Sequence, residues 1–284
     1  MTLYDVVRQI GDVEALDQAA RPLARAARKL IPPGPAKDIL SGSRLGHPLH
    51  PALTDIPIGS FAAATVLDLV GGRRSQDAVK ALLALGIVSA APTASAGWAD
   101  WSDTYGPEQR IGLVHALSNV ASLSLFAGSL VARRRGNRAL GRALSLLGMT
   151  TLTTGGYLGG HLTYALGVGV NNAFYQHEPE EWTPVMDAGD LQAGSPTKVE
   201  AGGATILLYR SSDRILAIGS RCSHAGGPLQ EGKIDDGNLC VECPWHGSVF
   251  RLEDGAVVHG PARVPQAAYD VRVQDGRIEV RHRA

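Results

Sequence analysis

Two short stretches decide how the last third of this chain folds: Cys222-Ser-His-Ala-Gly-Gly-Pro-Leu229 and Cys243-Pro-Trp-His-Gly-Ser248. Each contains one thiol and one imidazole, Cys222 with His224 and Cys243 with His246. The residues between the two stretches suffice for a hairpin that returns the chain to the same end of a sheet. The pattern therefore predicts one site with two thiolates and two imidazoles.

These four side chains suit an iron–sulfur cluster. Two thiolates can hold one iron and two imidazoles the other, which is the Rieske [2Fe–2S] ligand set. Two cysteines and two histidines also suit tetrahedral zinc, although zinc modules usually present C-x2-C and H-x3–5-H pairs. Such modules also lack the Gly-Gly-Pro and Pro-Trp-His-Gly loops present here. The loops therefore favour the cluster over a zinc ion.

Residues 183–284 resemble a Rieske domain, because both stretches fit the family's C-x-H and C-P-x-H-G pattern. The resemblance implies that the ligands of the cluster, and so of its metal, are Cys222, His224, Cys243 and His246. It also implies that Gly260–Pro261–Ala262 forms a third loop over the cluster. Ser248 matches a serine that donates its hydroxyl to the cluster in relatives, and Pro261 would lie beside the ligands.

Two departures from the high-potential members of that family concern the redox potential. Those proteins have an extra cysteine in each loop, where this chain has Gly227 and Trp245, and a tyrosine where it has Phe250. Hydrogen bonds to cluster sulfur stabilise the reduced state, so losing one lowers the potential. We expect a value in the lower part of roughly −150 to +300 mV. The spare Cys240 is expected to be a buried strand residue.

Short runs rich in β-branched and apolar residues surround the two stretches and predict strands. The runs are Thr205–Leu208, Ile215–Ile218, Val241–Glu242, Val249–Leu252 and Tyr269–Val273. Asp-Gly pairs at 236–237, 254–255 and 275–276 predict hairpin turns between such strands. This part of the chain is therefore expected to be a small, all-β, antiparallel domain.

The first half of the chain has a different composition, with long apolar stretches that contain few or no charges. Stretches of about 18 apolar residues are long enough to cross the bilayer as helices. We expect four transmembrane helices, at roughly 52–71, 80–99, 112–132 and 143–168. The alternative is a buried soluble bundle rich in alanine and glycine.

Residues from 46 to about 170 resemble an uncharacterised family of bacterial membrane domains that are often fused to Rieske domains. The residues that carry this resemblance are Gly46-His-Pro-Leu-His-Pro51, Asp55, Pro57–Ile58–Gly59 and Gly97–Trp98–Ala99–Asp100. The expected architecture is an all-α transmembrane bundle at 46–176 and an all-β Rieske domain at 183–284. Residues 1–45 are expected to be a connector with helices that are either solvated or lie on the membrane surface.

Charge distribution bears on location. The chain has 27 basic and 27 acidic residues and no basic stripe, so nucleic-acid binding is not expected. No secretory signal peptide is visible. The three cysteines, two of them assigned to the cluster, give no sign of an internal disulfide.

Basic residues gather in the first and third helix connections, and the positive-inside rule then places both termini and the Rieske domain on the extracytoplasmic side of a bacterial cell membrane.

Four histidines belong to the helical half: His47, His50, His115 and His161. With alternating helix directions, all four lie toward one membrane face. Ionisable residues at membrane depth are candidates for function, and a pair of them could bind a b-type haem or another metal. Alternatively they cap helices or hydrogen-bond across helices, for example to Asp55, Asp68 or Asn119.

The predicted function is one-electron transfer between a donor, quinol or a reductase, and an unidentified acceptor, with His224 and His246 as the exit. The partners would be a redox protein or a quinone, with the bilayer as support. Alternatives are a redox-sensing module or an electron supply for a separate oxygenase. A Rieske oxygenase itself needs a second domain with a mononuclear iron site, for which the residues after His246 are too few. No self-contained catalytic domain is therefore expected.

Overall fold

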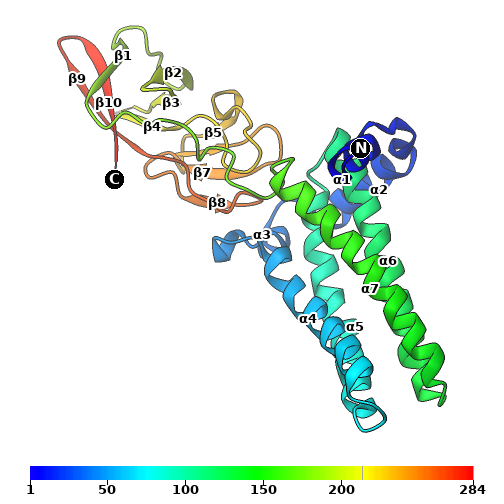
Figure 1. The fold of residues 1–284 in the computed structure, drawn as a ribbon. Helices are drawn as coiled ribbons and strands as arrows, with labels where there is room; N and C mark the ends of the chain where they lie inside the picture. Colours follow the sequence, from blue (N-terminus) through cyan, green and yellow to red (C-terminus); the bar gives the residue numbers. More distant parts are fainter. Residues whose placement is uncertain (213, 284) are drawn as a thin grey trace. The chain divides into compact units, whose positions relative to one another are not determined.

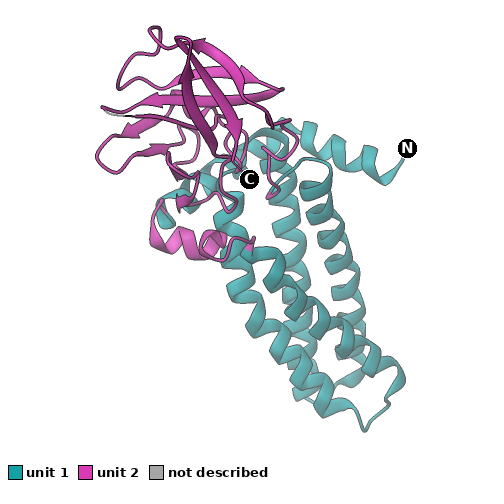
Figure 2. Cartoon of the chain, turned by 90° about the vertical axis from the view of Figure 1, so that its left-hand side faces the viewer, with its two compact units in different colours: residues 1–31, 49–168 teal, residues 32–48, 169–284 magenta. Residues whose placement is uncertain are grey.

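The computed structural model describes residues 1–212 and 214–283, and it divides into two compact units (Figure 2). The helical unit comprises residues 1–31 and 49–168. The β unit comprises residues 32–48 and 169–284, so a short N-terminal segment packs with the C-terminal domain. Residues 49–168 of the helical unit thus lie, in sequence, between the two parts of the β unit.

Six α-helices make up the helical unit (Figure 1). They are α1 (Leu3–Asp12), α2 (Asp17–Leu30), α4 (Leu49–Val70), α5 (Gln76–Trp101), α6 (Gly106–Arg134) and α7 (Arg138–Tyr164). The last four form two helical hairpins, in which α4 pairs with α5 and α6 pairs with α7. The hairpins meet in an apolar core where the rings of Phe61 and Phe126 stack with their centroids 3.9 Å apart.

Three of these helices, α4, α5 and α6, are long and apolar enough to cross a membrane, among the residues that the structure describes. Length and apolar composition thus support three of the four predicted crossing helices. The fourth, α7, is long enough, but its many glycines and threonines and the basic residues in its first turns lower its hydropathy. The expected bundle of four helices corresponds to α4–α7, and with α1, α2 and α3 (Pro35–Ser41) the described residues form seven α-helices.

Two ion pairs fix the polar ends of the helical unit. At one end the Arg133 guanidinium donates to both carboxylate oxygens of Asp68, at 3.0 and 2.8 Å, and both side chains are almost fully buried. At the other end Arg110 donates to both oxygens of Asp17, each at 2.8 Å. The second pair ties α2 to α6, and charged pairs with two parallel hydrogen bonds are among the stronger polar contacts.

The described residues of the β unit form three small antiparallel sheets, ordered β1-β10-β9, β2-β3-β4 and β5-β6-β7-β8 (Figure 1). Their strands are β1 (Thr183–Asp187), β2 (Thr197–Ala201), β3 (Ala204–Arg210), β4 (Ile215–Gly219), β5 (Lys233–Asp235), β6 (Cys240–Glu242), β7 (Val249–Arg251), β8 (Val257–His259), β9 (Tyr269–Gln274) and β10 (Arg277–His282). The all-β prediction is confirmed, and the three Asp-Gly pairs join β5 to β6, β7 to β8 and β9 to β10.

Candidate metal centre

The two loops that carry the predicted ligands have the same backbone conformation. In each loop the cysteine N–H donates to the carbonyl five residues later, from Cys222 to Gly227 at 2.8 Å and from Cys243 to Ser248 at 2.7 Å. In each, a glycine four residues after the cysteine donates back to the cysteine carbonyl and has φ near +75°. These glycines, Gly226 and Gly247, occupy the left-handed region that side chains with a Cβ rarely adopt.

The four predicted ligands come together as two pairs of like side chains. Cys222 and Cys243 are both buried, and their thiols are hydrogen-bonded to each other. The rings of His224 and His246 lie with their centroids 4.9 Å apart and nearly perpendicular. Among the described residues His224 Nδ1 is buried without a hydrogen-bond partner, and such orphaned buried atoms are rare unless something else binds them. The residues present therefore fit a group with two metals, each taking one pair.

The protonation of these side chains follows from their packing. The pKa of Cys243 is lowered to about 7, because Cys222 donates a hydrogen bond to its sulfur and the backbone N–H groups of Trp245 and His246 face it. That shared hydrogen bond, together with burial, raises the pKa of Cys222. Burial, then the neighbouring His246, lowers the pKa of His224 well below its usual range. A neutral imidazole is the form that binds a metal.

Ser248 links the second loop to the third. Its hydroxyl is fully buried and accepts a hydrogen bond from the Ala262 backbone N–H at 2.9 Å. The Ser248 hydroxyl hydrogen is therefore directed elsewhere. Phe250 is fully buried in the apolar core beside the cysteines, while Gly227 approaches so closely that a Cβ there would lie 2.9 Å from the Cys243 sulfur.

A residue that sequence reasoning missed holds the third loop in place. The Asp38 carboxylate, on α3, accepts a hydrogen bond from the Gly260 N–H at 2.8 Å and contacts His259 Nδ1 at 3.1 Å. Its side chain is only 4% exposed. Asp38 and Gly260 are separated by most of the chain and belong to no common motif, so no signal in the sequence pairs them. The N-terminal segment 32–48 is thus part of the candidate centre.

A second segment of the β unit supports the first ligand loop. Asn172 donates from its side chain to the His224 carbonyl at 2.9 Å, and its backbone N–H donates to the Ser223 carbonyl at 3.0 Å. The predicted strand position of Cys240 is confirmed, since it lies buried in β6 and its thiol donates to the Asn238 carbonyl. Cys240 takes no part in the loop geometry described above.

The structure brings together two of the four histidines assigned to the helical half. His50 on α4 and His115 on α6 have ring centroids 6.3 Å apart. His161 instead lies 5.2 Å from the ring of Tyr4. His47 is exposed and belongs to the β unit, where its Nδ1 contacts the Pro48 carbonyl.

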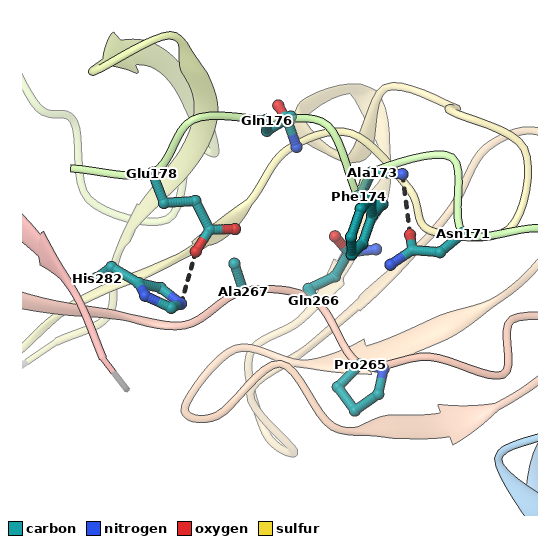
Figure 3. Close-up of a pocket in the computed structure, with 9 residues that line it drawn as sticks. All are labelled: Asn171, Ala173, Phe174, Gln176, Glu178, Pro265, Gln266, Ala267 and His282. Carbon is teal, nitrogen blue, oxygen red and sulfur yellow. Dashed lines mark hydrogen bonds and ion pairs between the residues drawn. The ribbon is translucent and has the colours of Figure 1, made fainter. Parts of the chain in front are cut away.

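A pocket of about 240 Å³ also lies in the β unit (Figure 3). In it His282 Nε2 contacts the Glu178 carboxylate at 2.6 Å, and the Ala173 N–H donates to the Asn171 side chain at 2.9 Å. Burial raises the pKa of Glu178 and the charge of His282 opposes that shift. Ligand pockets are usually about 300–1,000 Å³ and mostly apolar, so this small polar pocket is a poor candidate for a substrate site.

A small antiparallel β domain that presents two Cys/His loops side by side has the fold and ligand set of an iron–sulfur protein. A family model described as the Rieske [2Fe-2S] domain matches residues 181–270. A second, described as a predicted membrane protein (DUF2231), matches residues 46–172. The β domain therefore belongs to the Rieske [2Fe–2S] family, and it is fused to a membrane domain of the second family. With three apolar helices, the second match indicates that the chain resides in a membrane.

The curated relatives are similar to the β domain. The anthranilate 1,2-dioxygenase ferredoxin subunit of Burkholderia cepacia is 34% identical over 100 residues, which are 35% of this chain and 91% of that protein. Ferredoxin CarAc of Metapseudomonas resinovorans is also 34% identical over 100 residues, 92% of its length. A solved ferredoxin of carbazole 1,9a-dioxygenase from Nocardioides aromaticivorans IC177 is 32% identical, with a TM-score of 0.35, over 36% of this chain and 98% of that one.

Proposed function

We propose that this chain is a membrane-anchored Rieske protein that carries single electrons between a donor, quinol or a reductase, and a separate acceptor protein. The observation that carries the proposal is the pairing at one end of the β domain, thiol with thiol and imidazole with imidazole. A Rieske cluster supplies one-electron redox chemistry and is held by two thiolates on one iron and two imidazoles on the other. In this chain the holders would be Cys222, Cys243, His224 and His246.

The residues of the loops would then have distinct tasks. The backbone N–H groups that face the sulfurs of Cys222 and Cys243 would stabilise negative charge on them. Ser248, whose oxygen already accepts from Ala262, would donate its own hydrogen toward the same group. Pro261 would cover it from the third loop. His224 and His246, as neutral ligands, would form the edge through which electrons leave.

The arrangement disfavours a zinc site. A structural zinc ion takes four protein ligands in a tetrahedron. Among the described residues, no three His, Cys, Asp or Glu side chains are placed to hold one metal ion. Two pairs, each for its own iron, are the arrangement that a two-metal cluster needs.

The test is electron paramagnetic resonance of the full-length protein, purified in detergent and reduced with dithionite, with iron and zinc analysis of the same sample. We expect a rhombic signal of a [2Fe–2S] centre and two irons per chain. Cys243→Ser should abolish the signal, whereas Cys240→Ser, a buried cysteine outside the loops, should retain it. A silent sample with stoichiometric zinc would refute the proposal.

A second candidate function is electron supply to a separate oxygenase, which the relatives favour because they are named as ferredoxin subunits of dioxygenases. The two functions differ in the acceptor. Reoxidation of the reduced protein by a purified Rieske oxygenase terminal component would support the supply role. Rapid reduction by a short-chain quinol would identify quinol as a donor in either role, and a redox-dependent change in partner binding without turnover would indicate a sensor.

We also propose that the Rieske domain faces the extracytoplasmic side, because arginines gather at the α4–α5 and α6–α7 connections. A C-terminal fusion to alkaline phosphatase, which is active only outside the cytoplasm, should then be active. An inactive phosphatase fusion together with a fluorescent cytoplasmic reporter fusion would reverse the assignment.

A further inference from the structure

We propose that the helical unit binds a haem b whose iron is held on its two faces by His50 and His115. This would be a second one-electron centre, in which ferric iron accepts one electron and ferrous iron returns it. The proposal goes beyond the Rieske centre and rests on different residues. Its basis is the separation of the two rings, their hydrogen bonds and the small residues against which they pack.

The two histidines come from opposite helices of the bundle. His50 is the second residue of α4, and His115 lies in the third turn of α6. Both α4 and α6 pack against α5 and α7, so α4 and α6 are diagonal neighbours. Side chains that reach across the diagonal of a four-helix bundle meet in its core, where such bundles hold cofactors.

The separation of the two rings matches that of two axial ligands. Each metal–nitrogen bond would be about 2 Å and each nitrogen lies about 1 Å from its ring centre, so two imidazoles on opposite sides of one metal have centroids about 6 Å apart. The observed centroids of His50 and His115 are 6.3 Å apart. Their planes are 87° apart, which axial imidazoles can adopt by rotation about the metal–nitrogen axis.

The hydrogen bonds select the same nitrogen of each ring. His50 Nδ1 lies 2.9 Å from the Thr93 carbonyl on α5, and His115 Nδ1 lies 2.8 Å from the Gly155 carbonyl on α7. A carbonyl only accepts, so each Nδ1 carries the hydrogen and each Nε2 has the lone pair. Histidines that bind metals usually donate from their other nitrogen in this way, which fixes both tautomer and ring orientation.

Asn119 does not occupy the metal-binding position of His115. Its side-chain nitrogen lies 3.1 Å from Nε2 and 3.4 Å from Nδ1 of that ring. A donor in the ring plane, hydrogen-bonded to the Nε2 lone pair, would be about 5 Å from Nδ1. The amide therefore lies over the face of the ring, and it also donates to the His115 carbonyl at 3.0 Å. The Asn119 contact thus supports the orientation of the ring.

Small residues make room for both rings. A Cβ at Gly97 would lie 2.8 Å from His50 Cε1, and a Cβ at Gly159 would lie 3.1 Å from His115 Cε1. Any larger residue at Gly97 would therefore push the His50 ring away from α5. These glycines are spaced along α5 and α7, the two helices that flank the pair, and explain why both rings can turn inward.

The number of protein ligands favours haem iron over a bare ion. Among the described residues, no third His, Cys, Asp or Glu joins the pair to hold a metal ion. A bare zinc ion needs three or four protein ligands. Haem iron has four ligands from its macrocycle and takes from the protein only the axial ones, for which histidine is the usual choice.

The experiment uses the full chain, expressed with a haem precursor and purified in detergent. We expect a Soret band, about one haem b per chain by pyridine haemochrome, and a low-spin ferric spectrum. His50→Ala and His115→Ala should each convert the spectrum to high spin or reduce haem content at least tenfold. The matched control is His161→Ala, a buried histidine beside Tyr4 outside the pair, which should retain the low-spin spectrum.

Two further readouts keep the proposal falsifiable. If His115→Ala loses haem, the His115→Gly variant separates the two causes: added imidazole should restore the low-spin spectrum where only the ligand is missing, whereas a misfolded variant would not recover it. Absence of haem from wild-type protein that shows the Rieske resonance signal would overturn the haem site and leave the proposed function intact. A bare metal on the pair without haem, or equal loss in His161→Ala, would also overturn it.

Discussion

Asp38 offers the sharpest perturbation of the cluster loops from outside them. Asp38→Ala removes a buried carboxylate that accepts from the Gly260 N–H and contacts His259. A hydrogen bond to a charged group contributes about 1.5–3 kcal/mol, and a buried N–H left without an acceptor costs a similar amount. Since 1.4 kcal/mol is tenfold in an equilibrium constant, the third loop should open roughly ten to a hundred times more often.

The assay is the rate at which the purified protein loses its iron–sulfur absorbance to a strong iron chelator. If cluster loss requires opening of the third loop, Asp38→Ala should accelerate it roughly ten- to hundredfold. Asp38→Asn keeps an oxygen that can accept from Gly260, so its effect should be smaller. Asp187→Ala is the matched control, because Asp187 is 70% exposed and its nearest cation, Arg277, lies 3.9 Å away.

A wild-type rate in Asp38→Ala would refute the reasoning, because it would mean that the third loop does not limit access to the cluster. An equal acceleration in Asp187→Ala would show that any lost carboxylate of the domain has the same effect. Either result would separate segment 32–48 from the function of the centre.

Three further predictions concern the potential and the helical unit. Phe250→Tyr should raise the midpoint potential by about 20–60 mV in a redox titration, if the added hydroxyl reaches the cluster and contributes about 0.5–1.5 kcal/mol more in the reduced state. Ser248→Ala should lower the midpoint potential. Unchanged potentials in both variants would refute the hydrogen-bond argument. Asp68→Ala should destabilise the helical unit by about 3–5 kcal/mol in thermal unfolding, because it leaves Arg133 as a buried unpaired charge; an unchanged melting temperature would contradict this. Hydrogen bonds from Arg110 lower the pKa of Asp17 to about 2, below its ordinary 3.8, so the pair stabilises the fold above about pH 4 and this stabilisation is lost as the pH falls toward 2. The melting temperature should therefore fall more steeply between pH 5 and 3 in wild type than in Asp17→Asn. Equal slopes in the two proteins would argue against a role of this pair.

The β domain was largely predictable because its decisive residues are local. Each ligand loop spans only a few residues, and its Cys, His and Gly positions specify the turn without any distant contact. The Asp-Gly pairs also identified three hairpins. The strands that escaped prediction are β1, β2, β5, β8 and β10, which are short or rich in charged residues, so no apolar run marks them; β10 does alternate between polar and apolar residues, but only two of its residues, Ile278 and Val280, are apolar.

Long-range pairings were not predictable. The contact of Asp38 with Gly260, and that of His50 with His115, depend on which helices and loops meet in three dimensions. For α7, alternating small and hydroxylated residues gave a charge-free stretch of the right length without the hydropathy of the other helices. Absence of charge is therefore a weaker criterion for a crossing helix than apolar content.

The split of the β unit in sequence has a consequence for cutting the chain. In a simple fusion, one protease cleavage between α7 and β1 would release a ferredoxin-sized fragment. Here segment 32–48 packs with the β unit and continues directly into α4, so the nicked fragment would still be held through Asp38 and its neighbours. The family match to the Rieske domain begins only at residue 181. A stand-alone copy of that matched region would therefore lack the Asp38 carboxylate that holds the third loop, and a soluble version of this β domain would need residues 32–48 supplied as a second peptide.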